Sequence, residues 1–255
     1  MQLNFKRYND TGPVLVMMHG LFGSWENLGG IARYLTERFQ VYSLDMRNHG
    51  GSPHSSAMTL ADMAKDVVEF LDAHQLNDVY LLGHSLGGKV MMEVALSAPQ
   101  RVKRLVVADI APVDYGVPRH DDVFAGIESV QLAQLTARSQ ADKQLAEHIT
   151  EPAIRSFILK NLARRDDGSY FWRINVAGIK QNYFHLIGAN RADAQFDKPV
   201  LFIKGELSDY LRCEYTQEVM QRFPKAQVKV LSGTAHWLHA EKPELFARLV
   251  TNFLA

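Results

Sequence analysis

The chain has 255 residues, 47% of them apolar, so it is long enough and apolar enough to bury a sizeable core. Its 28 lysines and arginines balance its 28 aspartates and glutamates, which argues against nucleic acid as a partner because such binding usually requires a basic face. The single cysteine, Cys213, excludes an internal disulfide, and neither a signal peptide nor an apolar run of roughly 18 residues is present, so we expect a cytoplasmic protein without a membrane span.

Short apolar runs alternate with amphipathic segments in the first part of the chain. Thr59 is placed to cap one of the amphipathic helices, with Asp62 in its first turn. The alternation of strand and helix predicts parallel strands with helical crossovers on both faces of a sheet. The expected strands are 14–18, 41–44, 79–82 and 105–108, and the expected helices are 25–39, the one that Thr59 caps, and 89–98.

The alternation stops after the fourth strand. Residues 113–190 have a helical pattern with no convincing buried strand. The alternation resumes with strands at 199–203 and 228–231 and helices at 213–222 and 243–253. We therefore expect an α/β core made of residues 1–112 and 191–255, carrying a helical cap at 113–190.

The segment Gly83-His84-Ser85-Leu86-Gly87 follows a predicted strand directly and precedes a helix. This is the G-x-S-x-G pattern in the strand–turn–helix context that it requires. The turn is sharp enough that larger side chains two residues before and after the serine would collide. It projects the hydroxyl from the carboxyl edge of the sheet, near a helix N-terminus that favours developing negative charge. The pattern predicts Ser85 as a nucleophile.

A nucleophilic serine needs a general base, and the best-placed histidine follows the last predicted strand. His236 stands in Gly233-Thr234-Ala235-His236-Trp237, from which its ring can reach over the strand edge toward Ser85. His239 is the rival, but it lies nearer the final helix. We expect His236 to be the base.

The acid that orients the base has two main candidates. Asp109 ends the strand that follows the nucleophile's helix, whereas Asp209 lies after the strand at 199–203, which is the commoner position. Asp209, however, stands four residues after Gly205, where the usual spacing is three and the residue is Ser208. We prefer Asp109, keep Asp209 as the alternative, and regard Glu206 as a remoter third candidate.

The segment His19-Gly20-Leu21-Phe22-Gly23 follows the first buried strand. Hydrolases of this architecture take one oxyanion donor from the backbone after such a pair, and the other from the residue after the nucleophile. We expect the amides of Leu21 and Leu86, with Phe22 as a weaker alternative to Leu21. Histidines and acidic residues show neither metal-ligand spacing nor a phosphate loop, so we expect no metal and no cofactor.

Five motifs occur along the chain: HG-x-x-G, D-x-R-N-H-G, GHSLGG, the run ADIAPVDY and the ending GTAHWLHAEKPE. Together they resemble the YbfF-type bacterial esterases of the α/β-hydrolase superfamily. The likeness spans nearly the whole chain and is weak only in the helical insertion. It implies an α/β-hydrolase fold, an acid at the position of Asp109, and cofactor-free hydrolysis of carboxylic esters and often of acyl thioesters.

The resulting hypothesis is a serine carboxylesterase or acyl thioesterase that forms an acyl-enzyme on Ser85 and acts on a small molecule. An apolar acyl pocket is expected between cap and sheet, where Phe22, Phe124 and Tyr183 are candidate lining residues. The alternatives are a carbon–carbon bond hydrolase or cofactor-free perhydrolase that uses the same residues, and a binding protein that has lost its chemistry. The sequence does not indicate an oligomeric state.

Overall fold

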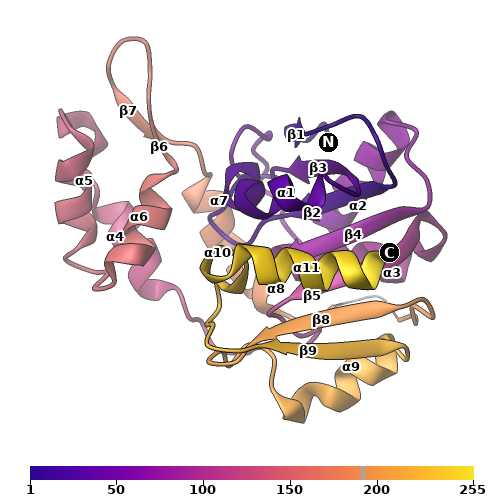
Figure 1. The fold of residues 1–255 in the computed structure, drawn as a ribbon. Helices are drawn as coiled ribbons and strands as arrows, with labels where there is room; N and C mark the ends of the chain where they lie inside the picture. The colour runs from indigo at the N-terminus through magenta and orange to yellow at the C-terminus, as the bar shows by residue number, and fades with distance from the viewer. Residues whose placement is uncertain (191–192) are drawn as a thin grey trace.

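A seven-stranded β-sheet forms the centre of the computed structural model, which describes residues 1–190 and 193–255. The strand order is β1-β3-β2-β4-β5-β8-β9 (Figure 1). Only β1 is antiparallel to its neighbour, so the other strands present their carboxyl ends at one edge. The strands are β1 (Phe5–Arg7), β2 (Val14–Met18), β3 (Gln40–Leu44), β4 (Val79–His84), β5 (Val102–Ala108), β8 (Val200–Gly205) and β9 (Ala226–Leu231).

Helices cover both faces of this sheet, and each face has its own apolar core. Successive strand residues point to opposite faces, so Leu15 and Met17 enter one core while Val16 and Met18 enter the other. The first core is closed by η1 (Trp25–Leu28), α1 (Gly29–Leu35), α10 (Leu238–Glu241) and α11 (Pro243–Leu254). The second is closed mainly by α2 (Leu60–Ala73), α3 (Leu86–Ser97) and α9 (Thr216–Arg222). Two short 3-10 turns, η2 (Pro99–Arg101) and η4 (Cys213–Tyr215), precede β5 and α9 respectively.

The expected parallel sheet with helices on both faces is confirmed. Thr59 caps α2 as predicted: its hydroxyl accepts from the amide of Asp62, whose carboxylate accepts from the amide of Thr59. Strand β1 and helix α10 lie outside the elements predicted from the sequence. Each is only three or four residues long, which is too short for a hydrophobic period to show.

The segment between β5 and β8 holds α4 to α8 and lies beyond the sheet, mostly to the left in Figure 1. A small hairpin, which the helical pattern did not predict, interrupts these helices. Its strands are half-buried and short, so they lack the apolar run of a core strand. The elements are α4 (Asp121–Ser129), η3 (Leu132–Gln134), α5 (Arg138–Leu145), α6 (Pro152–Leu159), β6 (Leu162–Arg164), β7 (Tyr170–Trp172), α7 (Val176–Gln181) and α8 (Tyr183–Ile187).

One buried lysine ties both ends of this helical segment to the core. Lys89, on α3, is 1% exposed. Its ammonium donates to the carbonyls of Val113, which precedes α4, and of Gly188, which directly follows α8, each at 2.6 Å. Burial lowers the pKa of Lys89 to about 7.

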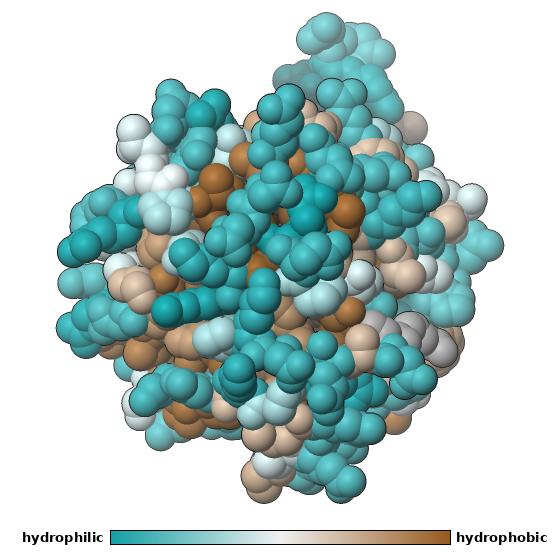
Figure 2. Space-filling view, turned by 90° about the vertical axis from the view of Figure 1, so that its right-hand side faces the viewer, coloured by the Kyte–Doolittle hydropathy of each residue, from teal (hydrophilic) through white to brown (hydrophobic). Residues whose placement is uncertain are grey.

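The side of the molecule away from the helical segment is mainly hydrophilic, with separate apolar residues showing between the polar ones (Figure 2). Within the described residues, no helix combines the length and apolarity that crossing a membrane requires.

The first turn of α3 packs directly on the end of β2. A Cβ added to Gly87 would lie 2.4 Å from the main-chain oxygens of both Met18 and His19. These neighbours are backbone atoms, so they could give way only if the helix moved off the sheet. Glycine at position 87 therefore allows the helix that follows Ser85 to pack this closely on the end of β2.

We predict that Gly87→Ala lowers the free energy of unfolding by about 2 kcal/mol or more, because overpacking of this kind typically costs about 1–3 kcal/mol. Thermal or denaturant unfolding measures the change. The matched control is Gly30→Ala in α1, where an added Cβ would meet nothing within 4 Å and alanine should be neutral or stabilising. Equal effects of the two substitutions would contradict the packing argument.

Candidate active site

Ser85 sits at the tip of the turn between β4 and α3 with an unusual backbone conformation. Its φ is 53° and its ψ is −123°, a region that costs a non-glycine residue about 1–3 kcal/mol. The turn is so tight that a Cβ added to Gly83 would lie 2.2 Å from the carbonyl oxygen of Gly87. The amide of Ser85 donates to the carbonyl of Ala108 at 2.9 Å, which holds the turn against β5. This geometry projects the Ser85 hydroxyl from the carboxyl edge of the sheet.

A chain of hydrogen bonds joins Ser85 to His236 and Asp109. His236 Nε2 lies 3.0 Å from Ser85 Oγ, and His236 Nδ1 lies 2.7 Å from Asp109 Oδ2. A carboxylate only accepts, so Nδ1–H donates to it and the bare Nε2 accepts from the serine hydroxyl. The carboxylate is fully buried, whereas the histidine side chain is 27% exposed. The imidazole is therefore held in the tautomer that can take the serine proton.

The other acid candidates lie away from His236. Asp209 is 63% exposed and pairs with the guanidinium of Arg119 at 2.9 Å. Glu206 accepts from the amide of Gly233 at 2.6 Å. The structure thus brings Asp109, and neither alternative, to the histidine.

Asp109 is fixed by the loop that follows β8. The amide of Gly205 donates to its Oδ1 at 3.0 Å, and the hydroxyl of Ser208 donates to its Oδ2. The main-chain amide of Asp109 donates to the carbonyl of Ile203 at 2.9 Å. Its φ of 54° turns the chain sharply at the end of β5, a conformation that aspartate tolerates better than most residues. A buried carboxylate with several donors is compensated for its loss of water.

His236 is also held through its backbone. His84 Nε2 lies 2.8 Å from the carbonyl oxygen of His236, so the neutral His84 ring donates to it. His239 packs against His84, with ring centroids 4.3 Å apart, and no hydrogen bond joins it to Ser85 within the described residues. On the other side, the ring of Tyr210 stacks on His236 at a centroid distance of 4.2 Å. The histidine loop is therefore clamped from both sides.

In the turn after β2, the amides of Leu21 and Phe22 differ in whether they are free to donate to an oxyanion. The amide of Phe22 donates to His49 Nε2 at 3.0 Å, so it is already engaged. The amide of Leu21 has no acceptor within the described residues, and that of Leu86 is a free first-turn amide of α3. His19 braces the same turn by accepting from the amide of Met46 at 3.0 Å. The available amides are those of Leu21 and Leu86.

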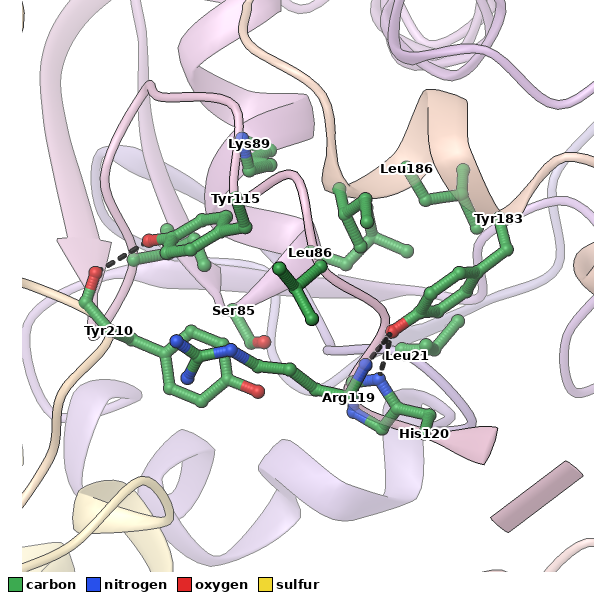
Figure 3. Close-up of a pocket in the computed structure, with 13 residues that line it drawn as sticks. Leu21, Ser85, Leu86, Lys89, Tyr115, Arg119, His120, Tyr183, Leu186 and Tyr210 are labelled. Carbon is green, nitrogen blue, oxygen red and sulfur yellow. Dashed lines mark hydrogen bonds between the residues drawn. The ribbon is translucent and has the colours of Figure 1, made fainter. Parts of the chain in front are cut away.

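Two cavities meet at Ser85. A narrow pocket of about 40 Å³ runs between α3 and α8 (Figure 3), and a wide cleft of about 680 Å³ lies between α6 and the loops that carry His19 and His236. The walls of the narrow pocket include Leu86, Ile110, Val117, Leu186 and Ile187, with Lys89 at its side. The wall of the wide cleft includes Phe22, Leu28, Ile154, Phe157, Ile158 and Trp237.

The structure separates the three residues that were expected to line an acyl pocket. Tyr183 lines the narrow pocket and Phe22 lines the wide cleft. Phe124 lines neither: it is 3% exposed and packs edge-on against both of the other rings, at 5.3 Å from Phe22 and 5.4 Å from Tyr183. Phe124 therefore supports the wall from behind and does not line a cavity. The prediction for Phe124 was wrong because helical spacing cannot show which side of a buried aromatic residue faces a cavity.

Three residues where the two cavities meet were not among the predicted site residues. Arg119, His120 and Tyr210 line both cavities. The guanidinium of Arg119 lies over the ring of Tyr210 at 4.9 Å (Figure 3). These residues come from two loops far apart in the chain, and no motif of fixed spacing marks them.

The site supplies proton transfer and fixed amide donors. Among the residues that the structure describes, no group of three or more histidine, cysteine, aspartate or glutamate side chains is placed to hold a metal ion. A serine hydroxyl, a histidine placed to take its proton and amides free to donate are the groups that acyl transfer uses in other enzymes.

Burial holds several histidines around the site in the neutral form. Burial lowers the pKa of His19 and of His120 to about 4, and of His49 and of His239 to about 3. Burial, with the neighbouring histidines, also places the pKa of His84 well below its ordinary value.

We predict that stability falls steeply as the pH drops below about 6.5, the pKa of an unfolded-chain histidine. The folded-state pKa values lie below that of the unfolded chain, so the unfolded chain binds more protons, and the stability present above pH 6.5 is lost toward acid. Each neutral histidine contributes up to about 1.4 kcal/mol per pH unit. The free energy of unfolding, measured with denaturant at several pH values between 7 and 5, gives from its slope against pH the number of protons taken up on unfolding. Several protons are expected at pH 5, and an uptake of fewer than about one would contradict the burial argument.

Comparison with known proteins agrees with this architecture. The family described as the alpha/beta hydrolase fold matches residues 13–243. The chain is 40% identical to esterase YbfF of Escherichia coli strain K12, covering 100% of this chain and 99% of that protein. It is 37% identical to the sn-1-specific diacylglycerol lipase ABHD11 of Xenopus laevis, covering 100% of this chain and 84% of that protein.

A solved structure is similar over the same extent. A marine microorganism esterase superposes with a TM-score of 0.96 at 37% identity, covering 99% of each chain. By both sequence and structure, the chain therefore belongs to the α/β-hydrolase family, and its resemblance to YbfF-type esterases is confirmed.

Proposed function

We propose that this protein is a serine hydrolase that cleaves carboxylic esters through an acyl-enzyme on Ser85. His236 is its general base and Asp109 the acid that orients and stabilises the base. The observation that carries the proposal is the hydrogen-bonded chain from Ser85 Oγ through the His236 ring to Asp109 Oδ2, at 3.0 and 2.7 Å. The names of the full-length relatives, an esterase and a diacylglycerol lipase, support ester chemistry.

The reaction has two halves. His236 takes the proton of Ser85 as its oxygen attacks the acyl carbon, and the amides of Leu21 and Leu86 donate to the oxyanion. The carbon–oxygen bond to the leaving group breaks, and the alcohol departs with the proton from His236. Water then gives a proton to His236 and attacks the acyl-enzyme, which releases the carboxylic acid and restores the Ser85 hydroxyl.

The two cavities suggest how the substrate divides between them. The narrow pocket, of about 40 Å³, is much smaller than the wide cleft, of about 680 Å³. We assign it to a short acyl chain. The wide, mainly apolar cleft is assigned to the leaving group. A thiol fits this cleft as well as an alcohol does, so short acyl thioesters belong to the proposed substrate class.

We predict that Ser85→Ala and Asp109→Asn each reduce hydrolysis of p-nitrophenyl butyrate by about 10⁴-fold or more, since one removes the nucleophile and the other the charge that stabilises the imidazolium. Turnover of the purified variants measures the loss.

The matched control is Asp209→Asn, which removes an exposed carboxylate that does not contact His236. This variant should retain activity within a few-fold. Loss of activity in Asp209→Asn with retention in Asp109→Asn would reverse the acid assignment. Activity of Ser85→Ala at the wild-type level would overturn the proposed function.

We predict that Leu186→Ala lengthens the preferred acyl chain, because Leu186 is a buried wall residue of the narrow pocket. The ratio of kcat/KM for p-nitrophenyl hexanoate to that for the acetate should rise by about 10-fold, as expected when two or more extra methylenes find room.

The control for this prediction is Leu159→Ala, which truncates a buried leucine of the same helical segment that lines neither cavity. It should lower stability and leave the chain-length ratio unchanged. A ratio that is equally unchanged in Leu186→Ala would show that the acyl group does not occupy the narrow pocket.

A further inference from the structure

His120 lies where the two cavities meet, and only one of its ring nitrogens is engaged by the protein. The residue directly precedes α4 and, like Ser85, lines both the narrow pocket and the wide cleft. Its Nδ1 lies 2.5 Å from the hydroxyl of Tyr183 (Figure 3), whereas its Nε2 has no hydrogen-bond partner within the described residues. The Nε2 side of the ring is therefore available to a substrate.

The hydrogen bonds of Tyr183 decide which nitrogen of His120 carries the proton. The amide of Arg119 donates to the Tyr183 hydroxyl oxygen at 3.1 Å, so this oxygen accepts on that side. Burial raises the pKa of Tyr183 to about 12, so the hydroxyl keeps its proton and donates it to His120 Nδ1. A neutral imidazole whose Nδ1 accepts carries its proton on Nε2. His120 therefore presents Nε2–H as a donor.

The ring of His120 is fixed in its orientation and in its neutral form. It packs edge-on against the rings of Phe22 and Tyr183, at centroid distances of 6.0 and 5.7 Å. Burial, and next the nearby His236, lower its pKa to about 4, so the ring is neutral at pH 7. Nε2 lies across the ring from Nδ1, and Tyr183 lines the narrow pocket but not the wide cleft. The Nε2–H donor therefore points away from Tyr183, toward the wide cleft.

We propose that His120 is a catalytic residue whose Nε2–H donates to the leaving-group oxygen of the substrate. This inference rests on the proposed function, which places the acyl group in the narrow pocket and the leaving group in the wide cleft. The bond that breaks then lies at the junction that His120 lines. Negative charge grows on the leaving oxygen as this bond breaks, and a fixed donor stabilises that charge. The proton that the alcohol keeps still comes from His236, and His120 keeps its own.

Such a contact assigns a preferred class of leaving group. Sulfur accepts hydrogen bonds only weakly, so a thioester gains little from the donor. A p-nitrophenolate spreads its charge over its ring and leaves readily without help. The alkoxide of a simple alcohol concentrates its charge on one oxygen and gains most. Within the proposed substrate class, His120 therefore favours oxygen esters of alkyl alcohols.

The first test is His120→Phe, which retains a flat ring against Phe22 and Tyr183 and removes the donor. The quantity measured is kcat/KM, which reports the steps up to departure of the leaving group, for ethyl butyrate, S-ethyl thiobutyrate and p-nitrophenyl butyrate. It should fall about 10-fold for ethyl butyrate and less than about 3-fold for the other two, as expected for one lost hydrogen bond to oxygen. The three substrates share one acyl group, so a change in the acyl pocket would affect them alike.

Two variants accompany this test. His120→Gln carries an amide that can reach the place of Nε2, and it should restore most of the rate lost with ethyl butyrate. His148→Phe is the matched control, because His148 is an exposed histidine of the same helical segment and lines neither cavity. It should leave kcat/KM unchanged for all three substrates.

The second test is Tyr183→Phe, which probes the tautomer in a protein that keeps His120. Without the hydroxyl, Nδ1 can carry the proton, so Nε2 is a donor for less of the time. The ratio of kcat/KM for ethyl butyrate to that for p-nitrophenyl butyrate should fall by about 3-fold, a part of the effect of losing the hydrogen bond outright. The same substitution made together with His120→Phe should not lower the ratio further, because the two residues act as one unit.

Two results would overturn this inference. One is an equal loss, or no loss, for all three substrates in His120→Phe. The other is an unchanged ratio in Tyr183→Phe.

Failure of this inference is distinguishable from failure of the proposed function. If Ser85→Ala abolishes hydrolysis while His120→Phe shows no dependence on the leaving group, the proposed function stands and only the role of His120 is wrong. If Ser85→Ala retains hydrolysis, both fail.

Discussion

A single buried carboxylate connects the fold to the candidate site. Asp109 is fully buried at the end of β5, and a charge in such a place is tolerated only if donors surround it. Those donors come from β8 and its loop, through Gly205 and Ser208, and from the loop after β9, through His236. Three neighbouring strands must therefore end at the same level of the sheet for the carboxylate to be satisfied. The parallel order β5-β8-β9 provides this alignment.

The same alignment explains why backbone strain collects here. Ser85, Asp109 and Phe22 each have a positive φ at the carboxyl end of a strand or in the turn that follows it. Such conformations persist only where the surrounding structure holds them. Here the amides of Ser85 and Asp109 are paired with neighbouring strands, and the amide of Phe22 with His49. These backbone conformations point the side chains of Ser85 and Asp109 toward His236. In the turn after β2, the amide of Leu21 has no acceptor within the described residues.

Buried neutral histidines form much of the scaffold around this edge. A neutral imidazole offers one donor and one acceptor on opposite sides of a flat ring, which suits a place where two backbone segments must be joined without a charge. His49 joins the turn after β2 to the loop after β3, and His84 joins the turn around Ser85 to the loop that carries His236. Since burial lowers the pKa of these rings and keeps them neutral, acid pH opposes the folded state.

The cavities depend on the segment between β5 and β8, which Lys89 holds at both of its ends. One wall of each cavity comes from the α/β core, chiefly from the loops at the carboxyl edge of its sheet, and the other comes from this segment, so neither wall determines the pocket alone. Arg119, His120 and Tyr210 lie where the two cavities meet. The division of the space into a narrow pocket and a wide cleft is thus a property of the assembled protein.

The sequence by itself determined the parallel sheet and the strand–turn–helix around Ser85. It also indicated His236 and Asp109 as the preferred candidates for base and acid, and it left their rivals open. These depend on local signals: apolar runs, the glycines at 83 and 87, and residues placed directly after strands. The tertiary structure alone decided which acid contacts His236, that the Phe22 amide is engaged by His49, and that Phe124 lies behind the pocket wall. Each of these is a contact between segments far apart in the chain, and no spacing along the sequence encodes which of two nearby groups the fold brings within about 3 Å.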